Sequence, residues 1–140
     1  MTISGKKEYL NSYAELNKEI NKKIEDLAEL QAYAERTTSV LSERVKGGES
    51  TNKLQIAVER IIELQKRINI DIDRFVDLRL EMEEKINKID DMKLCLLLKL
   101  RYIDEKKWSD IARLLYCNPK GKAVYKMQDK ALSLFEKDAD

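Results

Sequence analysis

The sequence has few of the residues that break helices, bind metals or form disulfide bonds. Its 140 residues include one proline, four glycines, two cysteines and no histidine. The two cysteines do not form a Cys-x-x-Cys pair, so a zinc site of the usual kind and a disulfide framework are both excluded. A serine or cysteine nucleophile would lack histidine, its commonest base, and the chain has no glycine-rich phosphate loop. We therefore expect a protein that is not an enzyme and that uses no cofactor or metal.

Long apolar runs are also missing. The longest run, Leu94–Leu98, has five residues, whereas a helix that spans a membrane needs about 20. No apolar segment follows a basic start, so a secretion signal is not expected. These absences predict a cytoplasmic protein.

Charged residues are abundant instead. They make up 38% of the chain, and hydrophobic residues make up 43%, which is enough to form a core. Long helices accommodate many charges with few turn residues, so this composition predicts an all-α fold.

Two long apolar stripes predict an antiparallel helical hairpin of the coiled-coil kind. The first lies between Lys6 and Val45 with steps of three and four residues, and the chain turns back at Gly47-Gly48. The stripes contain Tyr9, Tyr13, Leu16, Ile20, Ile24, Leu27, Leu30 and Ala34, and then Leu54, Ala57, Ile61, Leu64, Ile68, Phe75, Leu78, Met82, Ile86 and Ile89. Because Thr37-Thr38-Ser39 is a poor helix interior, we expect the first helix to fray or break after Arg36.

The second long helix has more apolar residues than a hairpin needs. The surplus residues are Val58, Ile62, Ile72 and Val76, beside the main stripe, and Ile56 and Ile70 elsewhere. A two-helix hairpin buries one narrow seam, so these side chains would contact water unless another helix covered them. We expect a homodimer, although a third helix of the same chain could also cover part of this surface.

The C-terminal part predicts three short helices. Asp90-Asp91 can cap the first of them, unless it continues directly from the preceding long helix, and Asp104–Lys107 is then a polar loop. Apolar periodicity predicts a helix that contains Trp108, Ile111, Ala112, Leu114 and Leu115, and another that contains Val124, Met127 or Gln128, Ala131, Leu134 and Phe135. Asn118-Pro119 predicts that this last helix starts near Pro119. We therefore divide the chain into a hairpin at 1–90, for dimerisation or partner contact, and a helix-turn-helix domain at 91–140.

Positive charge is concentrated in the predicted helix-turn-helix part. Residues 1–92 contain 16 basic and 19 acidic residues, a net charge of −3, whereas residues 93–140 contain 11 and 7, a net charge of +4. A basic part next to an acidic one is typical of proteins that contact nucleic acid with one part only.

The C-terminal motif resembles the helix-turn-helix of sigma factor region 4. The whole chain resembles a family of small phage and prophage proteins of Gram-positive bacteria that is related to late-transcription activators of the ArpU and RinA type. The residues that carry the resemblance are Leu98, Leu100, Arg101, Tyr102, Trp108, Ile111, Ala112, Val124, Tyr125, Ala131 and Leu132. It implies a cytoplasmic regulator in a bacterial host cell that activates late genes.

The resemblance also implies which residues contact double-stranded DNA. Lys122, Tyr125 and Lys126 would face base edges, while Lys120 and Lys130 would contact phosphates. Lysines on helices more often lie on an ordinary solvated face, and this alternative stays open. Trp108 is expected in the core, whereas Tyr125 fits either packing or a DNA contact.

Two functions are therefore compatible with the sequence. The first is a DNA-binding transcriptional regulator that reads a promoter, with the hairpin forming a dimer or contacting RNA polymerase. The second is a helical interaction protein of phage origin that captures another protein through the hairpin, such as an inhibitor of a host defence protein or a component like the small terminase subunit.

Overall fold

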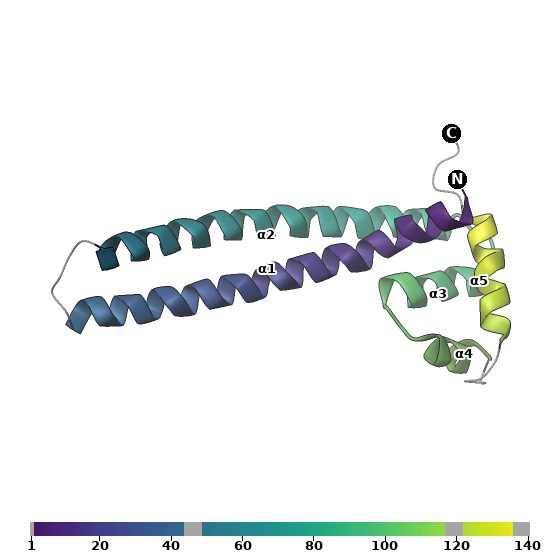
Figure 1. Ribbon diagram of the computed structural model, residues 1–140. Coiled ribbons are helices and arrows are strands. Elements are labelled where there is room, and N and C mark those ends of the chain that lie inside the picture. Colours follow the sequence, from purple (N-terminus) through teal and green to yellow (C-terminus); the bar gives the residue numbers. More distant parts are fainter. Residues whose placement is uncertain (1, 44–48, 117–121, 136–140) are drawn as a thin grey trace. The chain divides into compact units, whose positions relative to one another are not determined.

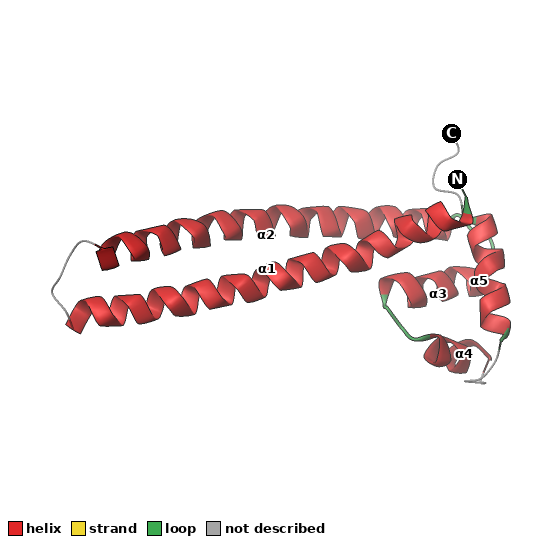
Figure 2. Ribbon diagram, in the orientation of Figure 1, coloured by secondary structure: helices red, strands yellow, loops and turns green. Residues whose placement is uncertain are grey.

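The computed structural model describes residues 2–43, 49–116 and 122–135. All regular structure in these ranges is helical, as predicted, in the order α1 (Ile3–Glu43), α2 (Glu49–Asn87), α3 (Met92–Leu98), the π-helix η1 (Lys99–Ile103), α4 (Trp108–Tyr116) and α5 (Ala123–Leu134) (Figures 1 and 2). None of the helices in the described ranges is both long and apolar enough to cross a membrane.

The chain forms two compact units. One consists of Met1–Leu16 together with Phe75–Asp140, and the other of Asn17–Arg74. The helices α1 and α2 contribute residues to both. The predicted division at residues 90 and 91 assigned dimerisation or partner contact to the first part and a helix-turn-helix to the second. This assignment stays a prediction.

The unit Asn17–Arg74 is a pair of antiparallel helical segments (Figure 1). Ile20, Ala57 and Ile68 are its buried apolar residues. The Lys23 ammonium forms an ion pair with the Asp71 carboxylate, which is itself 6% exposed. A nearly buried carboxylate needs such a partner, and this pair connects α1 to α2.

The helix α1 does not break after Arg36, so that prediction was wrong. The helix is continuous to Glu43. The hydroxyl groups of Thr37 and Thr38 donate hydrogen bonds of 2.9 and 2.8 Å to the carbonyl oxygens of Tyr33 and Ala34, four residues earlier. These bonds satisfy the hydroxyl groups within the helix, so the threonines remain helical.

The surplus apolar residues of α2 are exposed. Their exposed fractions are 49% for Ile56, 42% for Val58, 47% for Ile62, 59% for Ile70, 40% for Ile72 and 50% for Val76. The expected homodimer and the alternative of cover by a third helix of the same chain both stay predictions.

The other unit contains one hydrophobic core to which both ends of the chain contribute. It joins the start of α1, the end of α2 and all the short helices. Its buried members include Leu10, Tyr13, Met82, Ile86, Leu94, Leu97, Leu98, Tyr102, Ile111, Ala112, Val124, Ala131, Leu132 and Phe135. The Tyr13 and Phe75 rings stack beside it with centroids 4.2 Å apart. The short helices therefore share their core with the two long ones.

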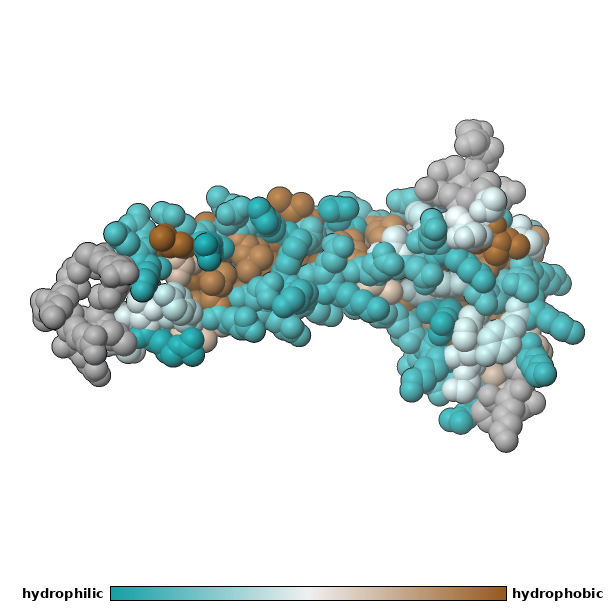
Figure 3. Space-filling view, viewed as in Figure 1, coloured by the Kyte–Doolittle hydropathy of each residue, from teal (hydrophilic) through white to brown (hydrophobic). Residues whose placement is uncertain are grey.

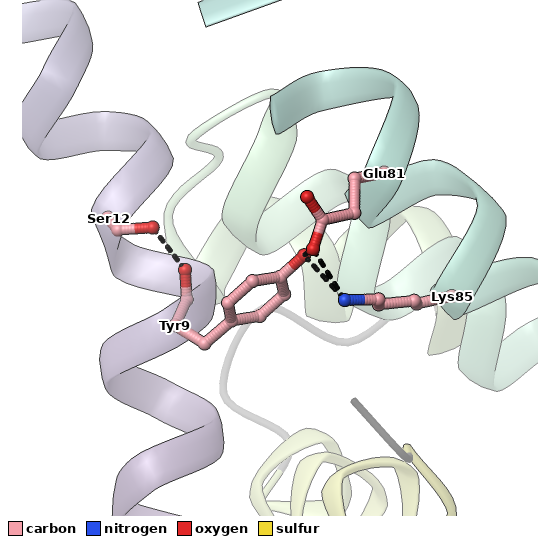
Figure 4. A network of polar contacts seen from close by, with 4 residues as sticks. All are labelled: Tyr9, Ser12, Glu81 and Lys85. Carbon is pink, nitrogen blue, oxygen red and sulfur yellow. Dashed lines mark hydrogen bonds and ion pairs between the residues drawn. The ribbon is translucent and has the colours of Figure 1, made fainter. Parts of the chain in front are cut away.

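Polar contacts join the same elements (Figure 4). The Tyr9 hydroxyl on α1 donates a 2.9 Å hydrogen bond to the Glu81 carboxylate on α2, which also accepts a 2.5 Å bond from the Lys85 ammonium. The Lys6 ammonium donates a buried 2.7 Å hydrogen bond to the carbonyl oxygen of Leu132 in the last turn of α5. A cation is favourable there because the carbonyl groups at a helix C-terminus carry partial negative charge.

The helices α2 and α3 are separate. Asp91 is the N-cap of α3, and its carboxylate accepts hydrogen bonds of 2.9 and 3.3 Å from the backbone N–H groups of Lys93 and Leu94. The buried Cys95 thiol lies under this junction and donates to the carbonyl oxygens of Ile86 and Ile89, and burial raises its pKa. Asp104–Lys107 is a loop, as predicted.

Candidate nucleic-acid interface

The helices α4 and α5 pack on the shared core with the faces predicted from their periodicity. Ile111 and Ala112 of α4 are buried, and so are the three residues expected to face inward on α5, namely Val124, Ala131 and Leu132. The helix α5 lies in the plane of Figure 1, whereas α4 points toward the viewer, so the two helices cross. This crossing leaves the outer side of α5 exposed.

Not every apolar residue of the motif is in the core. Leu114 is 63% exposed and Leu134 is 49% exposed, although both were part of the predicted periodic pattern. Of the two alternatives for the middle of α5, Gln128 is buried and Met127 is only half-buried. Periodicity alone does not distinguish adjacent positions at the edge of a buried face.

The described part of α5 starts with Ala123, and Lys122 is an N-cap without a side-chain hydrogen bond. The predicted start near Pro119 falls on residues 117–121. Residues 117–121, with the predicted phosphate contact Lys120, lie outside the described residues.

The other predicted contact residues lie together on the exposed side of α5. Lys122, Lys126 and Lys130 are four residues apart, and all three are exposed. Lys126 and Lys130 are therefore neighbours on one side of α5, and Lys122 lies directly before the helix as its N-cap. We call these three residues the lysine row. Asp129 is exposed between Lys126 and Lys130 and reduces the local positive charge, but three cations against one anion leave this side of α5 positive.

Tyr125 lies at the edge of the lysine row. It is 50% exposed, and its ring contacts the half-buried Trp108 ring with centroids 5.4 Å apart and planes inclined by 52°. Trp108 packs against the core, as predicted. The Tyr125 ring therefore packs against Trp108 while half of its surface faces solvent.

Arg101 completes this aromatic edge, and sequence reasoning did not identify its role. Its guanidinium group lies 4.7 Å from the centre of the Trp108 ring and donates a 3.1 Å hydrogen bond to the carbonyl oxygen of Lys106. A guanidinium group over an indole face is a favourable cation–π contact. Arg101 therefore links η1 to the start of α4. A single sequence contains no signal for this contact, because it depends on the path of the intervening loop.

A buried hydrogen bond sets the position of α5 on the core. The Gln128 side-chain amide donates a 2.7 Å bond to the hydroxyl oxygen of Tyr102 in η1. Burial raises the pKa of the Tyr102 hydroxyl, and the bond from Gln128 acts in the opposite direction. Because both polar groups are away from water, each depends on the other for its hydrogen bond. The pair thus fixes how far α5 is rotated, and with it the direction of the lysine row.

Comparison with known proteins places the chain in a family. No curated protein and no solved structure matches it. The model of one family matches residues 36–136, which include all of α2, the short helices and the lysine row. The chain belongs to that family, which is described as Protein of unknown function (DUF1492).

Proposed function

We propose that this protein is a DNA-binding transcriptional regulator and that α5 is the helix that contacts double-stranded DNA. The observation that carries the proposal is the lysine row. Lys122, Lys126 and Lys130 are exposed on one side of α5, while Val124, Ala131 and Leu132 on the other side are buried. A short helix that presents several cations from a packed support is the arrangement with which helix-turn-helix proteins enter the major groove.

Each member of the row has a different role in this proposal. The N-terminal half of a recognition helix lies nearest the bases, so Lys122 and Lys126 donate hydrogen bonds to base edges, as lysine does to guanine O6 and N7. Lys130 lies one turn further along and contacts a phosphate, as does Lys120, which precedes α5 in the sequence. The exposed half of Tyr125 lies beside Lys126 and reaches the sugar-phosphate backbone through its hydroxyl group.

The resemblance of the motif to sigma factor region 4 supports a promoter as the target. The likeness of the whole chain to phage and prophage activators of the ArpU and RinA type supports late-gene activation in a bacterial host. The long helices would then be available for contact with RNA polymerase or another protein. In this proposal α5 supplies the DNA contact and the paired helices supply the protein contact.

Selection from a library of random DNA duplexes tests the assignment of Lys122 and Lys126. We expect the wild type to enrich a defined sequence, and Lys122→Ala or Lys126→Ala to relax the preference at one or two base pairs, with a loss of about 1–3 kcal/mol of discrimination at each. Lys18→Ala, which removes an exposed lysine of α1, is the matched control and should leave the preference unchanged. An identical enriched sequence for all four proteins would refute base reading by α5.

The exposed apolar residues of α2 favour a second candidate function. In it, the chain is an interaction protein that captures a host or phage protein through its long helices, as an inhibitor of host defence or a packaging component would. A chain that ends near Asp91 should then keep full activity, and the alanine variants of the lysine row should be silent. The regulator requires the opposite result in both experiments.

A further inference from the structure

The helix α2 carries two apolar rows that are displaced by one residue. In the unit Asn17–Arg74, the first row faces α1 and contains Ala57, Ile61, Leu64 and Ile68, all buried or half-buried. The second row contains Val58, Ile62, Gln65, Asn69 and Ile72, and all five residues are exposed. We call the second row the outer row. Its steps of four, three, four and three residues are the heptad spacing of a helix that packs against another helix along its length.

Two such rows indicate two neighbouring helices. Adjacent residues of an α-helix are about 100° apart, so rows displaced by one residue face two directions that are close to a right angle. The helix α1 is the neighbour on the first row. On the outer row, Val58, Ile62 and Ile72 are 42%, 47% and 40% exposed. Figure 3 shows such hydrophobic surface among hydrophilic side chains along the long helices. The outer row therefore has the spacing and the exposure of a helix face that packs against a further helix.

We propose that the outer row packs against the outer row of a second copy of this chain, with the two α2 helices parallel and in register. The outer row contains no charged residue, so it offers a charged partner nothing to pair with. Its polar members, Gln65 and Asn69, carry carboxamide groups, which both donate and accept hydrogen bonds. Each can therefore pair with the identical group across a two-fold axis. The outer rows of two copies therefore match each other in apolar surface, in having no charged residue and in their hydrogen-bonding groups.

The charges beside the outer row select the parallel orientation. Glu59, Lys66 and Asp73 follow each other at intervals of seven residues along its free edge, and all are exposed. In an antiparallel pair, Ile62 of one α2 would lie opposite Ile72 of the other. Lys66 would then face Lys66 of the second copy, and Glu59 would face Asp73. A parallel pair places the charged edges on opposite sides of the seam, so like charges stay apart. Like charges that face each other across helices are unfavourable.

The position of Asn69 supports the same arrangement. In the heptad defined by the outer row, Ile62 and Asn69 occupy equivalent positions, one heptad apart. In parallel helix dimers this position is usually β-branched, and a single asparagine there specifies register and the number of helices at a cost in stability. Asn69 would then be the residue that keeps the assembly a dimer.

Sedimentation of the full chain without DNA tests the interface and does not depend on the proposed DNA binding. We expect the wild type to be a dimer and Ile62→Glu to be a helical monomer, because a carboxylate is costly only where the surface becomes buried. Ile70→Glu is the matched control. Ile70 is more exposed than Ile62, at 59%, but lies outside the outer row, so this variant should stay dimeric. A monomeric wild type, or equal effects of the two variants, would overturn the proposal.

Two further variants test the register without depending on a destabilising charge. Asn69→Val should strengthen association or increase the number of subunits, and an unchanged association constant would place Asn69 outside the seam. Under mild oxidation Ile72→Cys should form a disulfide between identical residues, since parallel helices bring residue 72 of both copies together. Cross-linking that occurs only when Ile72→Cys is mixed with Ile62→Cys would show an antiparallel pair and overturn the orientation.

Discussion

At the scale of single residues, Tyr102 and Gln128 determine how α5 is held. Replacing Tyr102 with phenylalanine removes the hydroxyl group but keeps the ring. The Gln128 amide would then be buried without its partner, and leaving a buried donor unsatisfied costs about 1–3 kcal/mol. We expect Tyr102→Phe to lower the free energy of unfolding by that amount in urea denaturation.

Tyr125→Phe is the control for this experiment. Tyr125 is 50% exposed, so the loss of its hydroxyl group should change stability by less than about 0.5 kcal/mol. If Tyr102→Phe proved as stable as Tyr125→Phe, the hydrogen bond would not be what positions α5, and the direction of the lysine row would have another cause.

Inward and outward positions on α5 could be predicted from the sequence, but specific pairs could not. The 3.6-residue period correctly placed Val124 and Ala131 inside, and the resemblance to sigma factor region 4 correctly placed Leu132 there. Gln128 and Tyr102 are 26 residues apart in the sequence. The pattern of apolar residues does not show which polar side chains pair inside the core. The stack of Arg101 on Trp108 was missed for the same reason.

At the scale of helices, the lengths of helices were predicted well where apolar periodicity extends over many turns, whereas the positions of helix ends were predicted less well. The ends depend on one or two residues. The start predicted near Pro119 falls on residues outside the described ranges. The threonines at 37 and 38 suggested a break, yet the helix is continuous there and their hydroxyl groups donate to carbonyl oxygens of the preceding turn.

The N-cap of α3 can be tested by substitution, with the neighbouring Asp90 as the control position. Asp91 is the member of the Asp90-Asp91 pair that accepts the capping bonds, from the backbone N–H groups of Lys93 and Leu94. Asp91→Ala should therefore destabilise the protein by about 0.5–2 kcal/mol, whereas Asp90→Ala should have little effect. Thermal unfolding of the two variants side by side measures the difference. Equal losses would mean that the charge of the pair matters and the cap does not.

At the scale of the whole molecule, the structure joins parts that the sequence separates. The predicted boundary between residues 90 and 91 follows a change in charge and in helix length. The core of the short helices, however, includes Leu10 and Tyr13 from α1 and Met82 and Ile86 from α2. Periodicity tells which side of a helix is buried but not which helix covers it, so this sharing could not be predicted from the sequence.

A fragment of residues 91–140 should consequently fail to fold on its own. It would expose the surfaces that Leu10 and Met82, both fully buried, cover in the complete chain. Its circular dichroism should show low helicity and no cooperative thermal transition, while the full chain unfolds cooperatively. A cooperative transition in the isolated fragment would show that the contacts from α1 and α2 are dispensable.

The most direct measurement for the proposed function is the salt dependence of binding to a labelled DNA duplex of mixed sequence, followed by fluorescence anisotropy. For the wild type we expect the logarithm of the association constant to fall linearly with the logarithm of salt concentration, with a slope of about −0.9 for each phosphate neutralised. Lys130→Ala should reduce the magnitude of that slope by about one, whereas Lys18→Ala should leave it unchanged. The same slope for all three proteins, or no binding at low salt, would contradict the assignment of the lysine row as a DNA-binding surface.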